Sequence, residues 1–368
     1  MKKSAVYFTT FRTTYTENRT QKLQRLLKRA GIESIDFRHK LVAIKMHFGE
    51  RGNLAFIRPN YARAVVELVK SLGGKPFLTD CNTLYVGGRG NTVDHLETAD
   101  LNGFTPLTVG CHVIIADGLK GMDEVLVPVP NGKYVKEAKI GRTIMEADVL
   151  LTLTHFKGHE AMGIGGAVKN IGMGCGSRGG KLEMHSDGKP YVDPETCIGC
   201  GMCLKVCAHG ALAMASRKMT INRGVCAGCG RCVGVCPKGA LMPQWGEQGF
   251  SVLDYKTAEY ALAVVTGRPH FHISLISDVS PNCDCHAEND AAVVPDIGML
   301  ASFDPVALDL ACADLCQRAP RLHGTVLDEV EEDGDLFDSI HPTTHWRDAM
   351  EHAVEIGLGS DRYDLITI

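Results

Sequence analysis

The sequence predicts an α/β protein with parallel or mixed sheet units and one small cysteine-rich module of α+β type inserted into them. Three observations support this class. Short β-rich apolar runs alternate with amphipathic helical stretches up to about residue 155. Eight of the 15 cysteines then fall between residues 197 and 236, and the α/β pattern returns afterwards. We therefore expect an α/β domain over 1–188, the cysteine-rich domain over 189–245, and an α/β part over 246–368 that could complete the first domain.

Before the cysteines, strand and helix signals alternate. Residues 41–47 (LVAIKMH) form a buried-strand pattern, and Pro59 suits the first turn of a helix that reaches Leu72 and stops at Gly73-Gly74. Further strands are expected over 76–79, 113–116 and 149–153, with a helix over 93–101 that Thr92 could cap. This alternation is the pattern of βαβ units and of a parallel sheet.

A change of composition marks residues 158–180, which contain nine glycines. We expect a glycine-rich loop that brings the backbone close to another group. After the cysteines, a helix is expected over 257–265, a strand over 271–276, and a helix that begins at Asp304-Pro305 with an aspartate cap.

Composition narrows the function classes. The chain of 368 residues is 45% hydrophobic and carries 39 basic against 43 acidic residues, so no basic field is present to attract nucleic acid. The N-terminus becomes polar before a signal-peptide core could form, and no run of ~18 apolar residues exists for membrane insertion. We therefore expect a cytoplasmic address, where cysteines are metal ligands or core residues before they are disulfides. Oligomeric state stays open.

Two cysteine runs with the same spacing lie 29 residues apart. They are Cys197, Cys200, Cys203 and Cys207, then Cys226, Cys229, Cys232 and Cys236. Cys-x-x-Cys-x-x-Cys places three soft thiolates around one iron–sulfur cubane, and the trailing cysteine of each run ligates the other cluster. We thus assign Cys197, Cys200, Cys203 and Cys236 to one [4Fe–4S] cluster, and Cys226, Cys229, Cys232 and Cys207 to the other. The alternative is a pair of zinc sites.

This segment resembles the bacterial 2[4Fe–4S] ferredoxins over roughly fifty residues. Pro237 follows Cys236 as in that pattern, whereas Ala208 follows Cys207. The resemblance implies an electron-transfer module with two adjacent clusters, and the alanine could change hydration near one of them.

A second concentration of reactive side chains follows the predicted strand 149–153. It contains His155, Lys157, His159, Glu160, Gly165, Gly166, Lys169, Lys181, Glu183 and His185. Ligands gather at the carboxyl ends of strands in open α/β sheets, and imidazole or a desolvated lysine can act as base, metal ligand or anchor. The alternative is a glycine-rich loop with solvated charges.

Two other strand ends could line the same crevice, or be surface loops. Lys45, His47 and Glu50 end one strand, and Asp80, Asn82, Tyr85 and Arg89 follow another. Cys283-Asp284-Cys285-His286 could bind a metal or form a redox thiol pair, although Cys-x-Cys is a weak signal. Cys312 and Cys316 are one helical turn apart, which favours a core role.

Across nearly its full length the chain resembles the DUF362 family of iron–sulfur centre proteins. The residues that carry this resemblance are 79–85 (TDCNTLY), His155 to Gly176, Asp278 to Asp284, and 301–305 (ASFDP). More remotely, His159, Lys169 and His185 repeat the order and spacing of a His, Lys and His in the nickel-pincer lactate racemases. That resemblance implies a cofactor anchor at Lys169, a metal ligand at His185 and an acid/base at His159.

These observations predict an iron–sulfur oxidoreductase, or a redox partner, that passes electrons through two clusters to a small-molecule or metal site. Candidate catalytic residues are His159, Lys169, His155, His47 and Asp80; candidate cofactor-binding residues are Lys169, Asn82, Gly165 and Gly166. A redox partner protein and an additional metal or organometallic cofactor would fit this interpretation. The alternatives are a non-catalytic electron carrier or sensor that docks on a partner enzyme, and a racemase-like enzyme with structural clusters.

Overall fold

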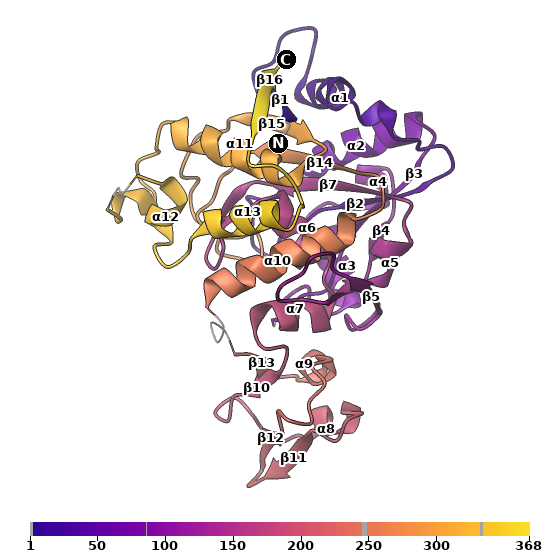
Figure 1. Ribbon diagram of the computed structural model, residues 1–368, viewed down its shortest axis with the longest axis vertical. Coiled ribbons are helices and arrows are strands. Elements are labelled where there is room, and N and C mark those ends of the chain that lie inside the picture. The colour runs from indigo at the N-terminus through magenta and orange to yellow at the C-terminus, as the bar shows by residue number, and fades with distance from the viewer. Residues whose placement is uncertain (1–2, 86, 245–248, 332–333) are drawn as a thin grey trace.

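The computed structural model describes residues 3–85, 87–244, 249–331 and 334–368 (Figure 1). The domain boundary expected at 245/246 lies outside these residues. An eight-stranded sheet of order β16-β1-β15-β14-β7-β2-β3-β4 forms the body. Its strands are β1 (Ser4–Thr10), β2 (Leu41–Lys45), β3 (Lys75–Asp80), β4 (Val113–Ile115), β7 (Val149–His155), β14 (His270–Ile276), β15 (Gly298–Ser302) and β16 (Tyr363–Thr367).

The sheet is mixed, as the α/β prediction allowed. β14, β7, β2, β3 and β4 are parallel neighbours, whereas β15 is antiparallel to both β14 and β1, and β1 is parallel to β16. Three of the eight strands, β14 to β16, come from the chain after the cysteine-rich segment. The cysteine-rich segment is therefore inserted between strands of one sheet.

Both faces of the sheet are buried, because alternate residues of each strand enter two separate cores. The helices of the body are α1 (Arg19–Arg29), α2 (Pro59–Ser71), α3 (Thr92–Leu101), α4 (Pro106–Val109), α5 (Arg142–Glu146), α6 (Ala167–Cys175), α7 (Arg178–His185), α10 (Phe250–Val265), α11 (Pro305–Arg318), α12 (Leu336–Ile340), α13 (Trp346–Glu355) and the short 3₁₀ turns η1 (Ile32–Ser34) and η2 (Val326–Asp328).

The helices divide between the two cores. Val42 and Ile44 join a core with α1 and α2, while Ala43 and Leu150 join another with α6, α10, α11 and α13.

Most predicted elements are confirmed with small shifts of their ends. The cap of α11 is Asp304, whose carboxylate accepts from the amides of Val306 and Ala307. The cap expected at Thr92 is wrong, because Asn91 occupies that position and accepts from the amides of Val93 and Asp94. Both residue types favour caps, and the sequence did not distinguish these neighbours.

The glycine-rich loop expected over 158–180 is also wrong. This segment forms the hairpin of β8 (Lys157–His159) and β9 (Gly163–Gly165), and then α6 and α7. Its glycines serve close packing: a Cβ on Gly172 would lie 2.0 Å from the Thr257 carbonyl oxygen of α10. The prediction that the backbone approaches another group is therefore right, although the conformation is mainly helical.

We expect Gly172→Ala to destabilise the protein by about 1–3 kcal/mol, because the added methyl group meets the backbone of α10. Intrinsic helix propensity alone favours alanine by about 1 kcal/mol. Thermal unfolding under anaerobic conditions measures the difference. Gly90→Ala is the control, since its added Cβ would have its nearest neighbours at 3.8 Å. A Gly172→Ala protein as stable as this control would contradict the packing described here.

The cysteine-rich module projects from the body beside α7 (Figure 1). It contains β10 (Pro190–Val192), α8 (Met202–Val206), β11 (Leu212–Ala215), β12 (Lys218–Ile221), α9 (Arg231–Val235) and β13 (Leu241–Pro243). β10 pairs with β13 and β11 with β12, both antiparallel. The 29-residue repeat of the sequence thus extends to structure, since α9 follows α8 at that interval.

Two further strands, β5 (Glu124–Pro128) and β6 (Glu137–Gly141), pair with each other beside the body. Among the helices in the described part of the chain, none is both long enough and apolar enough to cross a bilayer.

Candidate functional site

A cavity of about 830 Å³ opens at the carboxyl ends of β2, β3 and β7. This is the edge where ligands bind in open α/β sheets. Of the predicted site residues, those that line it are His47, Asp80, His155, His159, Gly166, Lys169 and His185. The adjacent carboxyl ends of these strands thus bring together side chains that lie far apart in the sequence.

Two predicted cofactor-binding residues have other contacts. The side-chain amide of Asn82 donates to Asp117 at 2.8 Å and to the Gly118 carbonyl oxygen at 3.0 Å, which ties two strand-end loops together. Gly165 lies in β9, where a Cβ would approach the Lys157 side chain at 3.0 Å. Asn82 therefore shapes the region through hydrogen bonds, and Gly165 shapes it through close packing.

Asp80 is the centre of a buried charge network. Its carboxylate lies 3.0 Å from Lys45 Nζ, 3.7 Å from Arg89 Nη1 and 3.7 Å from His95 Nε2. Burial alone would raise the pKa of Asp80, but Lys45, His95 and Arg89 outweigh it and lower the pKa. Glu50 pairs with Arg89 at 3.2 Å. Lys45, Glu50, Asp80 and Arg89 of this network form a charged part of the cavity wall.

His47 lines the cavity, and both of its ring nitrogens lie in buried surroundings. Its Nδ1 accepts from the Gly49 amide at 2.9 Å, and its buried Nε2 has no hydrogen-bond partner among the described residues. Burial, with Arg89 nearby, holds the pKa of His47 well below its usual value. A neutral ring that accepts at Nδ1 carries its proton on Nε2, so this N–H is a buried donor without an acceptor among the described residues.

His155 joins β7 to the loop after β14. Its Nδ1 lies 2.8 Å from Asp284 Oδ1, and its Nε2 lies 2.7 Å from the Ser277 carbonyl oxygen. Both ring nitrogens are therefore engaged. The contacts suit a residue that positions the Asp284 loop beside the cavity.

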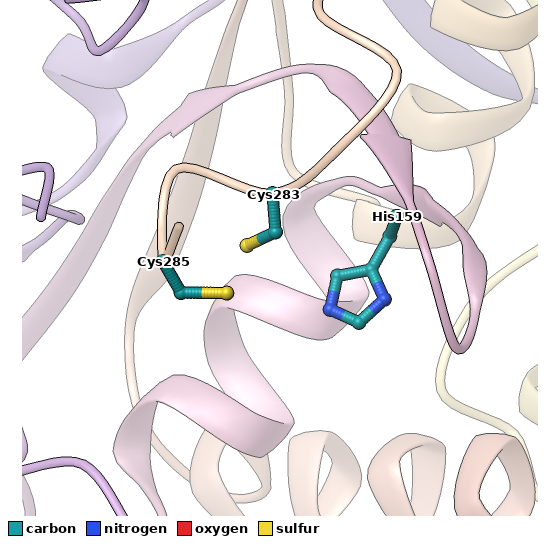
Figure 2. Close-up of side chains that lie close together, drawn as sticks. All are labelled: His159, Cys283 and Cys285. Atoms are coloured by element: carbon teal, nitrogen blue, oxygen red, sulfur yellow. The ribbon is translucent and has the colours of Figure 1, made fainter. Parts of the chain in front are cut away.

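That loop brings two thiols to His159. Cys283 Sγ, Cys285 Sγ and a ring nitrogen of His159 lie within 4.8 Å of one another, and Figure 2 shows the side chains directed toward a common point. Gly158 permits this approach, because a Cβ there would lie 2.1 Å from the Pro281 carbonyl oxygen. These atoms could hold a metal ion, as could Glu160, Cys285 and His286.

Lys169 lies 3.0 Å from Cys283 Sγ. The hydrogen bond from Cys285 lowers the pKa of Cys283 well below its usual value despite burial, and Lys169 acts in the same direction. Burial would lower the pKa of Lys169, but the Cys283 thiolate raises it. The structure thus places a partly buried lysine side chain in hydrogen-bond contact with a buried cysteine sulfur.

His159, Lys169 and His185 line the same cavity. Burial, followed by the nearby His159 and Lys169 side chains, lowers the pKa of His185 to about 3. A histidine that stays neutral retains a lone pair for a ligand.

The cysteines of the module fall into groups. Cys197, Cys200, Cys203 and Cys236 line one small cavity of about 20 Å³. Backbone amides donate to their sulfurs, from Met219 to Cys197 at 3.4 Å and from Ala240 to Cys236 at 3.2 Å.

The remaining four cysteines, Cys207, Cys226, Cys229 and Cys232, have related contacts. Burial and the neighbouring Cys226 and Cys229 raise the pKa of Cys232 to about 12. The Ala211 amide donates to Cys207 Sγ at 3.3 Å, which repeats the contact at Cys236. Gly201 and Gly230 occupy left-handed conformations, with φ of 71° and 69°, where α8 and α9 begin.

Helix α7 lies between the cavity and the cysteine module. Lys181 and His185 of α7 line the cavity, whereas Leu182 joins the apolar cluster that contains Cys197, Cys203 and Cys232. Leu84 belongs to both regions. Sequence reasoning missed this boundary, because its apolar residues carry no chemical signal.

Arg178, the first residue of α7, contacts both the module and the body. A Cβ on Gly234 would lie 3.1 Å from its side chain, and its Nε donates to the Lys120 carbonyl oxygen at 2.9 Å. The module therefore contacts the body through a buried cation that sequence reasoning also missed.

Fold and site together define an α/β protein with a cysteine-rich insertion and groups of side chains that could bind metal. The chain belongs to the family described as "Domain of unknown function (DUF362)", whose model matches residues 42–314. Thylakoid-associated protein sll1697 of Synechocystis is 28% identical over 130 residues, which are 34% of each chain. The chain thus spans about a third of that curated relative.

Two solved structures were also matched. The lactate racemase apoprotein of Thermoanaerobacterium thermosaccharolyticum has a TM-score of 0.35 at 12% identity, covering 75% of this chain and 51% of that chain. A protein from Thermotoga maritima has a TM-score of 0.39 at 10% identity, covering 81% and 58%.

Proposed function

We propose that this protein is an iron–sulfur oxidoreductase that exchanges electrons between two [4Fe–4S] clusters and a ligand in the cavity. The observation that carries the proposal is the position of α7. His185 and Lys181 face the cavity from this helix, while Leu182 packs among the cysteines of the module. A short helix thus connects the candidate redox centres with the candidate ligand site.

The cysteines fit the proposed clusters. The four that line the small cavity are the set expected for one cluster, and amide donors to sulfur are among the features that tune cluster potentials. When bound, two such clusters supply one-electron chemistry. The chain's own residues would orient a ligand through His47, hold its negative charge beside Lys169 and Lys181, and provide His159 for proton transfer.

We expect anaerobically prepared protein to contain about eight irons per chain, the number that two cubanes require. After dithionite reduction and removal of excess reductant, cluster reoxidation is followed by absorbance with a panel of small disulfide and quinone acceptors. An enzyme should show saturable reoxidation that His159→Ala and Lys169→Ala abolish. Cytochrome c, as a protein acceptor, provides the control. If both variants reoxidise as fast as the unchanged protein with every acceptor, the protein is a carrier and the enzymatic proposal fails.

A second candidate, a racemase-like enzyme with structural clusters, is favoured by one observation: His159, Lys169 and His185 line one cavity. In that case Lys169 would hold an organometallic cofactor and His185 a metal. Elemental analysis without nickel, together with an intact mass that shows no adduct on Lys169, would eliminate it.

A further inference from the structure

We propose that Cys283 and Cys285 are a redox-active dithiol that cycles between two thiols and an intramolecular disulfide at the cavity wall. This inference deepens the proposed function and rests on it, since the clusters would be the one-electron donors. The two cysteines lie in the loop between β14 and β15, separated only by Asp284. Figure 2 shows their sulfurs on the same side of that loop, opposite the His159 ring.

The loop is held at its middle residue. Asp284 is fully buried, and its carboxylate lies 2.8 Å from His155 Nδ1 and 3.8 Å from Lys157 Nζ. Both lysine and histidine belong to the β7–β8 segment, so the flanking cysteines are positioned by the sheet. Such anchoring limits the movement of both sulfurs relative to the cavity.

The surroundings of the sulfurs favour a metal-free dithiol over a metal ligand set. His159 Nδ1 accepts from the amides of Ala161 and Met162 at 3.1 and 3.2 Å. A neutral ring that accepts there carries its proton on the other nitrogen, which faces the sulfurs. A metal would need a lone pair at that nitrogen, and a ligating histidine normally donates its second N–H to an acceptor. Here the second nitrogen is Nδ1, which faces two amide donors and, within the described part of the chain, no acceptor for an N–H.

Access differs between the two thiols. Cys283 is fully buried beside the Lys169 ammonium, whereas Cys285 is partly exposed and lines the cavity. A disulfide between residues separated by one position closes a very small ring, and strained disulfides are the more readily reduced ones. The pair therefore has the features of a labile, functional disulfide.

The electron balance matches the rest of the chain. Reduction of the disulfide breaks one S–S bond, consumes two electrons and two protons, and yields two thiols. The return step forms the S–S bond and passes those two electrons and two protons to a small disulfide or quinone acceptor in the cavity. Two [4Fe–4S] centres acting as one-electron donors supply the two electrons together. Lys169 and His159 lie beside the sulfur that accepts the charge as the bond breaks.

An anaerobic reductive titration tests this proposal. Protein is first oxidised with oxidised glutathione and then titrated with dithionite, and electrons per chain are counted. We expect about four electrons, two for the disulfide and one for each cluster, against about two for Cys283→Ser or Cys285→Ser. Cys312→Ser, a buried cysteine of α11, serves as the matched control and should still accept four. Alkylation and peptide mapping should find one Cys283–Cys285 bridge before titration and two free thiols afterwards.

The proposal is overturned if oxidised protein with full iron accepts only two electrons and both thiols remain open to alkylation. It is equally overturned if the purified protein holds one non-iron metal ion that Cys285→Ser removes. If anaerobically purified protein contains no iron but still forms the Cys283–Cys285 bridge, the dithiol is supported and the cluster proposal is refuted. The failure of one proposal can therefore be distinguished from the failure of the other.

Discussion

Replacing Cys236 with alanine is expected to lower the iron content from about eight to about four per chain. Cys236 ends the second cysteine run, yet it lines the same small cavity as Cys197, Cys200 and Cys203 of the first run. Loss of one thiolate should release that cubane and leave the other in place. Iron analysis and electron paramagnetic resonance of the reduced protein measure both the amount and the identity of the surviving cluster.

Double variants test the exchange of trailing cysteines between the runs. If Cys200 and Cys236 ligate one cluster, Cys200→Ala/Cys236→Ala should retain as much iron as either single variant. Cys226→Ala/Cys236→Ala should retain almost none. Cys111→Ala, outside both sites, is the control and should keep full iron. A double variant of Cys226 and Cys236 that retained half the iron would assign Cys236 to its own run.

Local sequence patterns predicted most of the individual helices and strands, but not how distant strands pair. Asp304-Pro305 specified the start of α11, and the apolar run after Leu41 specified β2, because caps and strand patterns depend on a few neighbouring residues. The place of β16 beside β1 could not be predicted in this way. It pairs Ser4 with Tyr363, and nothing in either short segment identifies the other.

The site was also predictable only where local patterns indicate it, and not where it depends on long-range contacts. Strand ends indicated His47, Asp80 and His155 because parallel strands end at one edge. The partner of Lys169 was not predictable, since Cys283 is 114 positions away in the loop between β14 and β15, which meets α6 only in the folded chain. The high glycine content also led to the wrong assignment of α6 as a loop. A helix whose glycines allow close contact with α10 is as rich in glycine as a loop would be, so composition alone does not distinguish the two.

The buried pair of Lys45 and Asp80 should produce the other large effect. Lys45→Met is expected to cost about 3–5 kcal/mol, because it leaves Asp80 buried without its nearest positive charge. Lys45 also donates to Asn170 Oδ1 at 2.8 Å, so its loss disturbs α6 as well. Thermal unfolding under anaerobic conditions measures the change. Lys40→Met is the matched control, since its ion pair with Asp148 is exposed, and it should change stability by less than about 1 kcal/mol.

The same pair predicts the direction of a pH effect. Lys45, His95 and Arg89 outweigh burial and lower the pKa of Asp80 below its unfolded value of about 3.9. A lowered carboxyl pKa contributes stability that is fully present above the unfolded value and is lost as pH falls through the folded value. Between about pH 5 and pH 3 the unchanged protein should therefore lose more unfolding free energy than Asp80→Asn, which has no proton to bind at this position. Parallel acid profiles for the two proteins would mean that Asp80 does not stabilise the fold through its charge.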